Sequence, residues 1–514
     1  MSVRLRLAAL MKFSITNTSH TFIPAGLFVV FLHEVTSFEP KIRKQIEKIV
    51  LSEQFEDKQG KTLLIRIEQN KILVVGLGKL EELTMHDWQT VFAHMARKAK
   101  EVNAKTLTIA LPIEAFAKKM LMIPEKLIQG AVEGLILGAY EFLKHKHTDE
   151  QKKEKKIEEV MFCVDTKFEK EVQKGIDVGQ RTGKATLFAR DLVNEPSSVT
   201  TPTFLSLIAQ SLAKDNQDIS CEILGKKDME ILGMGGILGI AKGSDEEPKL
   251  IVLRYSSKEE RSKGSSSRTS SLNNKTIVLV GKGVTFDSGG LSLKSQEGME
   301  TMKIDMAGAA SILGFFSVIS ELHPRATVIG LIPAVENMPS GKAIKPGDIV
   351  TSYKGKTIEI ISTDAEGRVI LADVLAFAET FHPDTIIDLA TLTGACIVAL
   401  GDEVAGLFTT DRRLGEHLLT DSFMSGEKLW ELPLVKDYEE LLRSPIADMK
   451  NVSKKRYGGA ITGALFLKPF VPEGVPWAHI DIAGPAWQEK DSALCPEGGT
   501  GFGVRLILEY LKTQ

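Results

Sequence analysis

Short apolar runs alternate with longer stretches of helical period along the first third of the chain. The apolar runs predict strands at 27–32, 63–67, 72–75, 106–110 and 160–164. The helical periods predict helices over 87–102, 124–143 and 170–190. Asn194 and Pro196 then supply stop and turn signals. This pattern is typical of a small α/β domain that ends in a linking helix.

Beyond residue 190 the apolar runs are more completely hydrophobic. They predict buried strands at 250–255, 276–281, 326–332, 385–389 and 479–482. The apolar run 306–320, too short to cross a bilayer, predicts a buried helix. Strands that alternate with such helices predict a mixed, mostly parallel sheet covered by helices. We therefore expect an α/β chain of two domains, a smaller N-terminal domain over 1–190 and a larger one over 191–514.

Charge and cysteine content exclude several classes of function. The 514 residues include 64 Lys and Arg against 67 Asp and Glu, a net charge of -3, so no global basic field attracts nucleic acid or anionic membrane. The four cysteines lie far apart without a CxxC pair, which excludes a disulfide framework and a zinc finger. The apolar run at 7–10 is too short for a signal peptide. We expect a cytoplasmic protein and assign no role to residues 1–10.

Two segments differ from the rest in composition. The lysine-rich stretch 145–156 has no apolar face, and the stretch 256–274 is rich in serine and charge. Both predict solvated loops. Nucleic-acid binding by the first and a phosphorylation or recognition role for the second are the alternatives.

Three motifs in the second half place charged residues in otherwise small and apolar sequence. The first, VGKGVTFDSGGLSLK, contains Lys282, Asp287 and Lys294 among glycines that let a ligand approach the backbone closely. A phosphate-binding loop or a structural lysine–aspartate pair are the alternatives, but no GxxxxGK[ST] pattern is present.

The other two motifs supply three more carboxylates. Asp305 of MKIDMAG precedes the apolar run, where capping of a helix is the simpler interpretation. Asp364 and Glu366 of STDAEGR lie two apart on a short connection, with Arg368 two residues further on. Capping can explain one of these acids but not the whole group.

The motifs together predict a metal site, because all three lie where predicted strands give way to helices, the usual ligand crevice of such sheets. Four carboxylates cannot share a buried crevice as anions without compensating charge. Two divalent cations would provide that charge. None of the ten histidines lies in these motifs. Oxygen ligands alone favour magnesium or manganese, whereas one neutral lysine amine shifts the preference toward zinc, cobalt or manganese.

This combination of motifs resembles the leucyl aminopeptidase (cytosol aminopeptidase) family of dinuclear metallo-exopeptidases. The resemblance extends to NEPSSVTTP at 194–202, DLATLTGAC at 388–396, KRYGGAITGALFL at 455–467 and HIDIAGPAW at 479–487. It implies an enzyme that releases N-terminal amino acids from peptides by attack of a metal-bridging water. It also implies a zinc-exopeptidase-like catalytic domain and a hexamer made of two trimers.

The resemblance assigns roles to individual residues. It implies that Asp287 and Glu366 bridge two metal ions, zinc or manganese, and that Asp364 completes one site. Lys282 and Asp305 would complete the other site, with Lys282 as a neutral amine. Lys294 would stabilise the oxyanion as a cation, and Arg368 would hold a bicarbonate acting as general base.

The resemblance further implies a small apolar side-chain pocket that suits Leu or Met. Its lining would be Met302, Thr391, Gly394, Ala483 and Ala486, for each of which core packing is the alternative. Ser362 stands where asparagine is usual in the family and alters hydrogen bonding around the site rather than a ligand. A non-catalytic nucleic-acid-binding regulator on the same scaffold and a dinuclear phosphatase are the competing functions.

Overall fold

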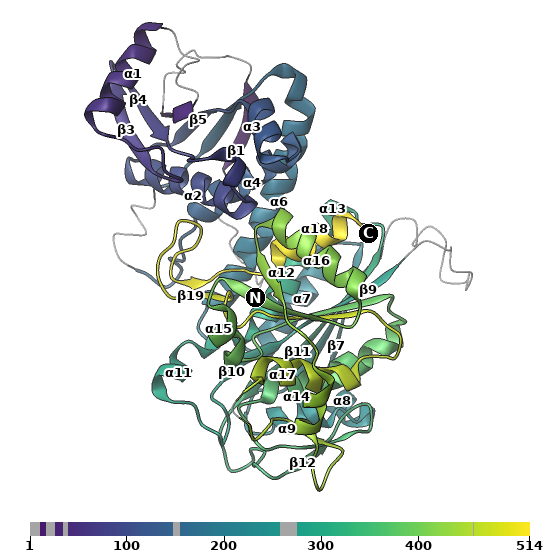
Figure 1. Ribbon diagram of the computed structural model, residues 1–514. Coiled ribbons are helices and arrows are strands. Elements are labelled where there is room, and N and C mark those ends of the chain that lie inside the picture. The colour runs from purple at the N-terminus through teal and green to yellow at the C-terminus, as the bar shows by residue number, and fades with distance from the viewer. Residues whose placement is uncertain (1–10, 17–25, 34–39, 148–154, 257–274, 456) are drawn as a thin grey trace.

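The computed structural model describes residues 11–16, 26–33, 40–147, 155–256, 275–455 and 457–514, arranged as two α/β domains (Figure 1). The extension 1–10, most of the serine-rich stretch and residues 148–154 of the lysine-rich stretch lie outside these ranges. Among the described residues, no helix is both long and apolar enough to span a membrane.

The N-terminal domain is built on a six-stranded sheet in the order β1-β6-β5-β2-β4-β3. All neighbours are parallel except β3 and β4. The strands are β1 (Lys12–Thr16), β2 (Leu27–Phe31), β3 (Thr62–Ile67), β4 (Asn70–Val75), β5 (Thr106–Ala110) and β6 (Glu159–Cys163). The helices are α1 (Pro40–Ser52), α2 (Met85–Glu101), α3 (Ile113–Met120) and α4 (Pro124–Gly138). The predicted strands are confirmed, with bounds that shift by one or two residues.

The predicted helix 124–143 ends earlier than expected, at Gly138. Beyond it the chain turns so that Lys144 forms an ion pair and His145 a hydrogen bond with the buried carboxylate of Glu195. These long-range contacts override the local preference for helix.

Helix α6 (Glu169–Asn194) joins the two domains and packs against both α4 and α12. Residue 190, the expected end of the first domain, therefore lies inside this helix. Gly175, Gly179 and Gly183, spaced four apart, form one stripe along α6 that faces α4. A Cβ at Gly175 would lie 2.4 Å from a backbone oxygen of α4, so the two helices approach more closely than larger residues would permit.

The larger domain contains a nine-stranded mixed sheet. Its main path is β16-β15-β18-β14-β9-β11-β8-β7, and β10 pairs with β11. Five of its neighbouring pairs are parallel, and the pairs β15–β18, β8–β11 and β7–β8 are antiparallel. The strands are β7 (Ile219–Leu224), β8 (Lys249–Tyr255), β9 (Thr276–Gly281), β10 (Gly283–Asp287), β11 (Thr327–Asn337), β14 (Thr385–Ala390), β15 (Val404–Thr409), β16 (Lys428–Glu431) and β18 (Trp477–Asp481). The expected mostly parallel sheet is thus confirmed.

Helices cover both faces of this sheet, which explains the continuous apolar strands. In β9, Ile277 and Leu279 pack with one core, whereas Val278 and Val280 pack with the other. The first face carries α6, α7 (Pro202–Asp215), α12 (Ala307–Phe316), α16 (Arg412–Ser425) and α18 (Val504–Lys512). The second carries α8 (Lys226–Leu232), α9 (Gly235–Ala241), α14 (Glu366–Phe377) and α17 (Gly459–Leu467).

Three short strands form a separate small sheet in the order β12-β13-β17. They are β12 (Ile349–Thr351), β13 (Thr357–Glu359) and β17 (Met449–Lys450). The strand that precedes Asp364 is β13, so this part of the predicted site does not follow a strand of the main sheet. Instead, a loop from the small sheet reaches the end of the main sheet.

The two domains meet through a buried polar network between α2 and α4 on one side and the α16–α18 region on the other. Lys126 Nζ lies 2.6 Å from Glu509 Oε2 across this boundary. Arg505 donates to Gln89 Oε1 over 2.7 Å, and Gln89 donates to Glu133 Oε2 over 2.7 Å. Because buried polar groups must be paired, this network favours one docked arrangement of the domains.

Candidate metal centre

The candidate residues come from four segments that converge near the ends of β9 and β10. Lys282 lies directly between these strands, and Asp287 is the last residue of β10. Asp305 belongs to the 3₁₀ helix Met302–Met306 that leads into α12. Asp305 is therefore not the N-cap of α12, since that position is occupied by Met306.

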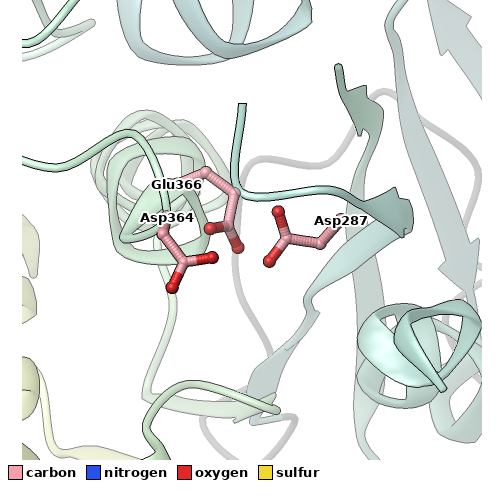
Figure 2. Close-up of side chains that lie close together, drawn as sticks. All are labelled: Asp287, Asp364 and Glu366. Atoms are coloured by element: carbon pink, nitrogen blue, oxygen red, sulfur yellow. The ribbon is translucent and has the colours of Figure 1, made fainter. Parts of the chain in front are cut away.

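Asp364 lies in the loop that follows the small sheet, and Glu366 is the first residue of α14. Together with Asp287 they place one carboxylate oxygen each within 4.8 Å of one another. Figure 2 shows the three carboxylates pointing toward a common space between the end of β10 and the start of α14. This convergence of distant segments is the geometry that the motifs predict.

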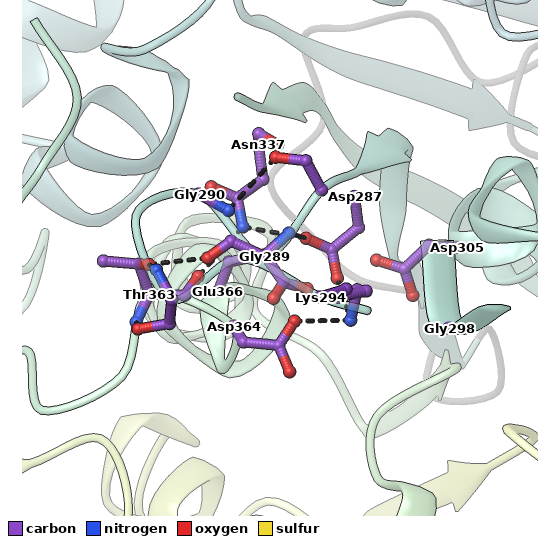
Figure 3. A network of polar contacts seen from close by, with 12 residues as sticks. Asp287, Gly289, Gly290, Lys294, Gly298, Asp305, Asn337, Thr363, Asp364 and Glu366 are labelled. Carbon is purple, nitrogen blue, oxygen red and sulfur yellow. Dashed lines mark hydrogen bonds and ion pairs between the residues drawn. The ribbon is translucent and has the colours of Figure 1, made fainter. Parts of the chain in front are cut away.

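Two lysines link the carboxylates into pairs. Lys282 Nζ lies 2.6 Å from Asp305 Oδ1 and 2.8 Å from Glu366 Oε1. Lys294 Nζ lies 2.8 Å from Asp287 Oδ2 and 2.5 Å from Asp364 Oδ1 (Figure 3). All four predicted carboxylates and both lysines are therefore in direct contact within one site.

The loop from Asp287 to Lys294 is interlocked with the loop that carries Asp364. Asn337, at the end of β11, donates to Asp287 Oδ1 over 2.8 Å and to the Thr363 carbonyl over 2.9 Å (Figure 3). The Thr363 hydroxyl donates to the Gly289 carbonyl over 2.6 Å. Gly289 has a φ of 84°, a conformation that favours glycine, and its N–H donates to Asp287 Oδ1. The carboxylates are thus held by neighbours that lie far away in sequence.

Burial and mutual repulsion disfavour the charged carboxylates. Burial, with the charge of Glu366 added, raises the pKa of Asp305 and the pKa of Asp287 above their usual range. Burial also raises the pKa of Asp364. For both lysines burial favours the neutral form, but the adjacent carboxylates outweigh it, so the pKa of Lys282 and that of Lys294 are raised.

The donor set fits divalent cations. Among the described residues, the buried oxygens Asp305 Oδ2 and Glu366 Oε2 have no hydrogen-bond partner. Unpaired buried carboxylate oxygens are costly, and coordination of a cation removes that cost. Four carboxylates and one amine that can lose its proton form an oxygen-rich set that suits manganese or zinc.

Arg368 lies two residues beyond Glu366 on the first turn of α14 and is buried. Its Nη1 donates to the Asn451 carbonyl over 2.8 Å, while its Nε has no partner in the described part of the chain. Burial lowers the pKa of Arg368 to about 10, so the guanidinium stays charged at neutral pH. A buried guanidinium with a free N–H can accept a small anion.

The five expected pocket residues have different surroundings. The Thr391 hydroxyl donates to Asp305 Oδ1 over 2.7 Å, and the Thr391 carbonyl accepts from Lys282 over 2.9 Å. Thr391 is therefore part of the site itself. Three others fit a nearby surface: Met302 begins the element of Asp305, Gly394 is exposed, and Ala483 is half-buried. Ala486 is 1% exposed and packs in the main core.

Several residues that hold the site were not predicted from the sequence. They are Asn337, Thr363, Asn451 and Asp481, the last of which accepts hydrogen bonds from Leu392 N, Thr393 N and Thr393 Oγ1. Asn337 and Asp481 are each the last residue of a buried strand of the main sheet. A polar residue at the end of an apolar run is the sequence signal that points to them. Asn451 carries no such signal, because its strand has only two residues.

Comparison with known proteins agrees with this geometry. Residues 187–508 match the catalytic domain of the cytosol aminopeptidase family, and residues 33–149 match its N-terminal domain. A "Probable cytosol aminopeptidase" of Alkaliphilus metalliredigens is 39% identical over 98% of this chain and all of its own length. One from Rippkaea orientalis is 41% identical over 93% of both chains.

Solved structures show the same likeness. A tomato leucine aminopeptidase mutant superposes with a TM-score of 0.84 at 31% identity, covering 98% of this chain and 97% of its own. The bottromycin maturation enzyme BotP in complex with Mn gives a TM-score of 0.82 at 33% identity, over 95% and 98%.

The fold and the site thus define a metal-dependent peptidase of two domains. The chain belongs to the cytosol aminopeptidase family, and it is an aminopeptidase.

Proposed function

We propose that this aminopeptidase uses two divalent cations, zinc or manganese, held by Lys282, Asp287, Asp305, Asp364 and Glu366. Asp287 and Glu366 would lie between the two cations. Lys282 and Asp305 would complete one site and Asp364 the other. The observation that carries this proposal is the convergence of four carboxylates, two of which have a buried oxygen without a hydrogen-bond partner among the described residues.

The residues around the centre support separate roles for the cations, Lys294 and Arg368 in peptide hydrolysis. Bound cations would polarise the scissile carbonyl and make a water between them nucleophilic near neutral pH. Asp287 and Asp364 hold the Lys294 ammonium at the mouth of the site, where it can donate a hydrogen bond to the developing oxyanion. Arg368 would hold bicarbonate as the general base, because its buried Nε has no partner among the described residues.

We further propose substrates with an apolar N-terminal residue of the size of Leu or Met. Thr391 connects the expected pocket to the centre through Asp305. A Cβ placed on Gly394 would meet no heavy atom within 4 Å, so this position borders open space. The remaining lining would be Met302, Ala483 and Ala486.

Assembly and location also belong to the proposal. The expected assembly rests on the family to which the chain belongs. We expect a hexamer of two trimers, with a sedimentation mass near six times the 56.4 kDa of one chain. A fully active monomer would contradict it. We expect a cytoplasmic location, which rests on the name that the family and its relatives carry.

The decisive experiment combines metal removal with a panel of aminoacyl amides. Strong chelation should abolish hydrolysis of leucine amide, and zinc, manganese or cobalt should restore it. Full activity in a preparation verified as free of metal would refute the proposal. A phosphate ester tested in parallel separates the peptidase from a dinuclear phosphatase.

A further inference from the structure

One buried residue outside the three motifs holds the whole segment that carries Asp364, Glu366 and Arg368. This residue is Asn451, which directly follows β17 and is 0% exposed. Its backbone N–H donates to the Glu359 carbonyl over 3.0 Å, which continues the parallel pairing of β17 with β13. Asn451 is thereby fixed beside the point where the chain leaves the small sheet for the metal centre.

The side chain of Asn451 forms hydrogen bonds with the loop that follows β13, both as an acceptor and as a donor. Its Oδ1 accepts from Ile361 N over 2.8 Å, and its Nδ2 donates to the Ser362 carbonyl over 2.6 Å. Longer bonds of 3.4 Å join Oδ1 to Ser362 N and Nδ2 to the Ala365 carbonyl. An amide suits this position, because it offers an acceptor and a donor side by side at this length.

The main chain of Asn451 holds the other end of the segment. Its carbonyl accepts from Arg368 Nη1 over 2.8 Å, which sets the direction of the buried guanidinium. All the hydrogen bonds described for Asn451 therefore go to residues between Glu359 and Arg368. The loop between them has no regular secondary structure until α14 begins at Glu366.

We propose that Asn451 is a positioning residue of the metal centre, which fixes Asp364 and Glu366 for cation binding and aims Arg368 toward the substrate side. This inference rests on the proposed function, because it assumes that these carboxylates bind cations. Metal ligands must be held to within about 0.5 Å of their working geometry. Residues that support ligands in this way typically change metal affinity or activity by about 10- to 100-fold when they are replaced.

Asp448 provides a matched control in the same small sheet. Its carboxylate accepts from Thr357 N and Thr357 Oγ1, each over 2.8 Å, at the far end of the pairing between β13 and β17. Asp448→Ala should loosen that sheet without removing a contact to the loop of Asp364. It thus reports the effect of lost stability alone.

The experiment compares Mn²⁺ binding to the full-length wild type, Asn451→Ala, Asn451→Asp and Asp448→Ala by calorimetry, with thermal stability and steady-state kinetics on leucine amide. Asn451→Asp has almost the same size and keeps the bond from Ile361, so it tests the donor bonds without leaving a cavity. It loses both donor bonds. We expect Mn²⁺ to bind about 10- to 100-fold more weakly to both Asn451 variants, with kcat reduced at saturating metal. Asp448→Ala should bind Mn²⁺ within about twofold of the wild type.

Two results would overturn the inference. Folded Asn451 variants that bind Mn²⁺ as tightly as the wild type would show that the centre does not depend on this residue. An equal loss of affinity in Asp448→Ala would show that stability of the small sheet is responsible. If the wild type itself bound no Mn²⁺, or bound it without hydrolysing any aminoacyl amide, the proposed function would fail instead, and the two failures are therefore distinguishable.

Discussion

Lys282 and Lys294 are both amines among carboxylates, but their surroundings differ. Lys282 is enclosed by Asp305, Glu366 and the Thr391 carbonyl, and its side chain is 4% exposed. The Lys294 side chain is 17% exposed and borders the open part of the site. A Cβ on Gly367 would lie 2.3 Å from Lys282 Cε, so the space around Lys282 is full. These surroundings support the proposed roles of Lys282 as a metal ligand and of Lys294 as a partner of the substrate.

Substitution of the two lysines should therefore give different results. Lys282→Arg should lose metal as well as activity, because a guanidinium stays protonated and does not fit the space. Lys294→Ala should retain both metals and lose a factor of roughly 10² to 10³ in kcat, as a typical oxyanion donor does. Metal content by mass spectrometry and turnover on leucine amide measure both effects. An empty site in Lys294→Ala beside a loaded site in Lys282→Arg would mean that the roles are reversed.

Metal binding should release a proton from Lys282. The carboxylates of Asp305 and Glu366 raise the pKa of Lys282 despite its burial, so this amine carries a proton at neutral pH when no cation is bound. A lysine ligand must be neutral, and binding of the cation is then coupled to loss of the proton. We expect the affinity for Zn²⁺ to rise with pH between about pH 7 and pH 9, because Lys282 stays protonated over this range as long as no cation is bound.

Calorimetry in buffers of different ionisation enthalpy measures the number of protons released. An affinity for Zn²⁺ that is constant over this pH range would rule out Lys282 as a ligand.

At the scale of secondary-structure elements, glycines spaced four residues apart bring helices together in the N-terminal domain. Gly130, Gly134 and Gly138 of α4 face α2, and a Cβ at Gly134 would lie 2.3 Å from the Gln89 carbonyl oxygen. In an isolated helix, Gly→Ala is stabilising by about 1 kcal/mol. Here the added methyl group meets a backbone atom that cannot easily move.

Gly134→Ala should therefore lower the free energy of unfolding, by about 1–3 kcal/mol, as overpacking usually does. Gly341→Ala is the matched control, because a Cβ there would meet nothing within 4 Å and the change should stay within about 0.5 kcal/mol. Urea unfolding of both variants gives the comparison. A more stable Gly134→Ala protein would contradict the close approach of α2 and α4.

The elements also show how far sequence alone could lead. Five strands of the main sheet, β8, β9, β11, β14 and β18, could be predicted because both their faces are buried, and β9 in particular is a continuous apolar run. The candidate carboxylates could be predicted because charged residues are rare in such small and apolar sequence. The residues that hold the site in place could not be predicted, because Asn337 and Asn451 act through contacts with segments that lie tens of residues away in the sequence. The early end of α4 has the same origin, in the contacts of Lys144 and His145 with Glu195.

At the scale of the whole molecule, stability depends on charges buried near the domain boundary. Asp421 of α16 is one of them, with a side chain that is 5% exposed and an Oδ2 without a hydrogen-bond partner among the described residues. Burial, and then the charge of Glu509, raises the pKa of Asp421 to about 7. The folded chain therefore binds a proton here more tightly than the unfolded chain, whose aspartates titrate near about 3.9.

The sign of the pH dependence follows from this difference. The contribution of Asp421 is most favourable below about pH 4 and is lost as the pH rises to about 7, where the folded protein must hold a buried anion. Asp421→Asn removes the carboxylate and should therefore raise the free energy of unfolding at pH 8 by about 1–3 kcal/mol. This gain is smaller than the full pKa shift of Asp421 implies, because solvent screens part of the charge. At pH 4.5 the substitution should have little effect. Urea midpoints at the two pH values test this, and equal effects at both would contradict it.

Helix α6 also limits how this chain can change in length. Each residue added to a helix turns everything beyond it by about 100° and advances it by about 1.5 Å. One residue inserted directly after Gly183 would turn either the glycine stripe away from α4 or Ala185 and Ala189 away from α12. It would also separate the charged partners at the domain boundary. The number of residues in α6 thus fixes the relative orientation of the two domains. Insertions and deletions should therefore be confined to loops on either side of this helix.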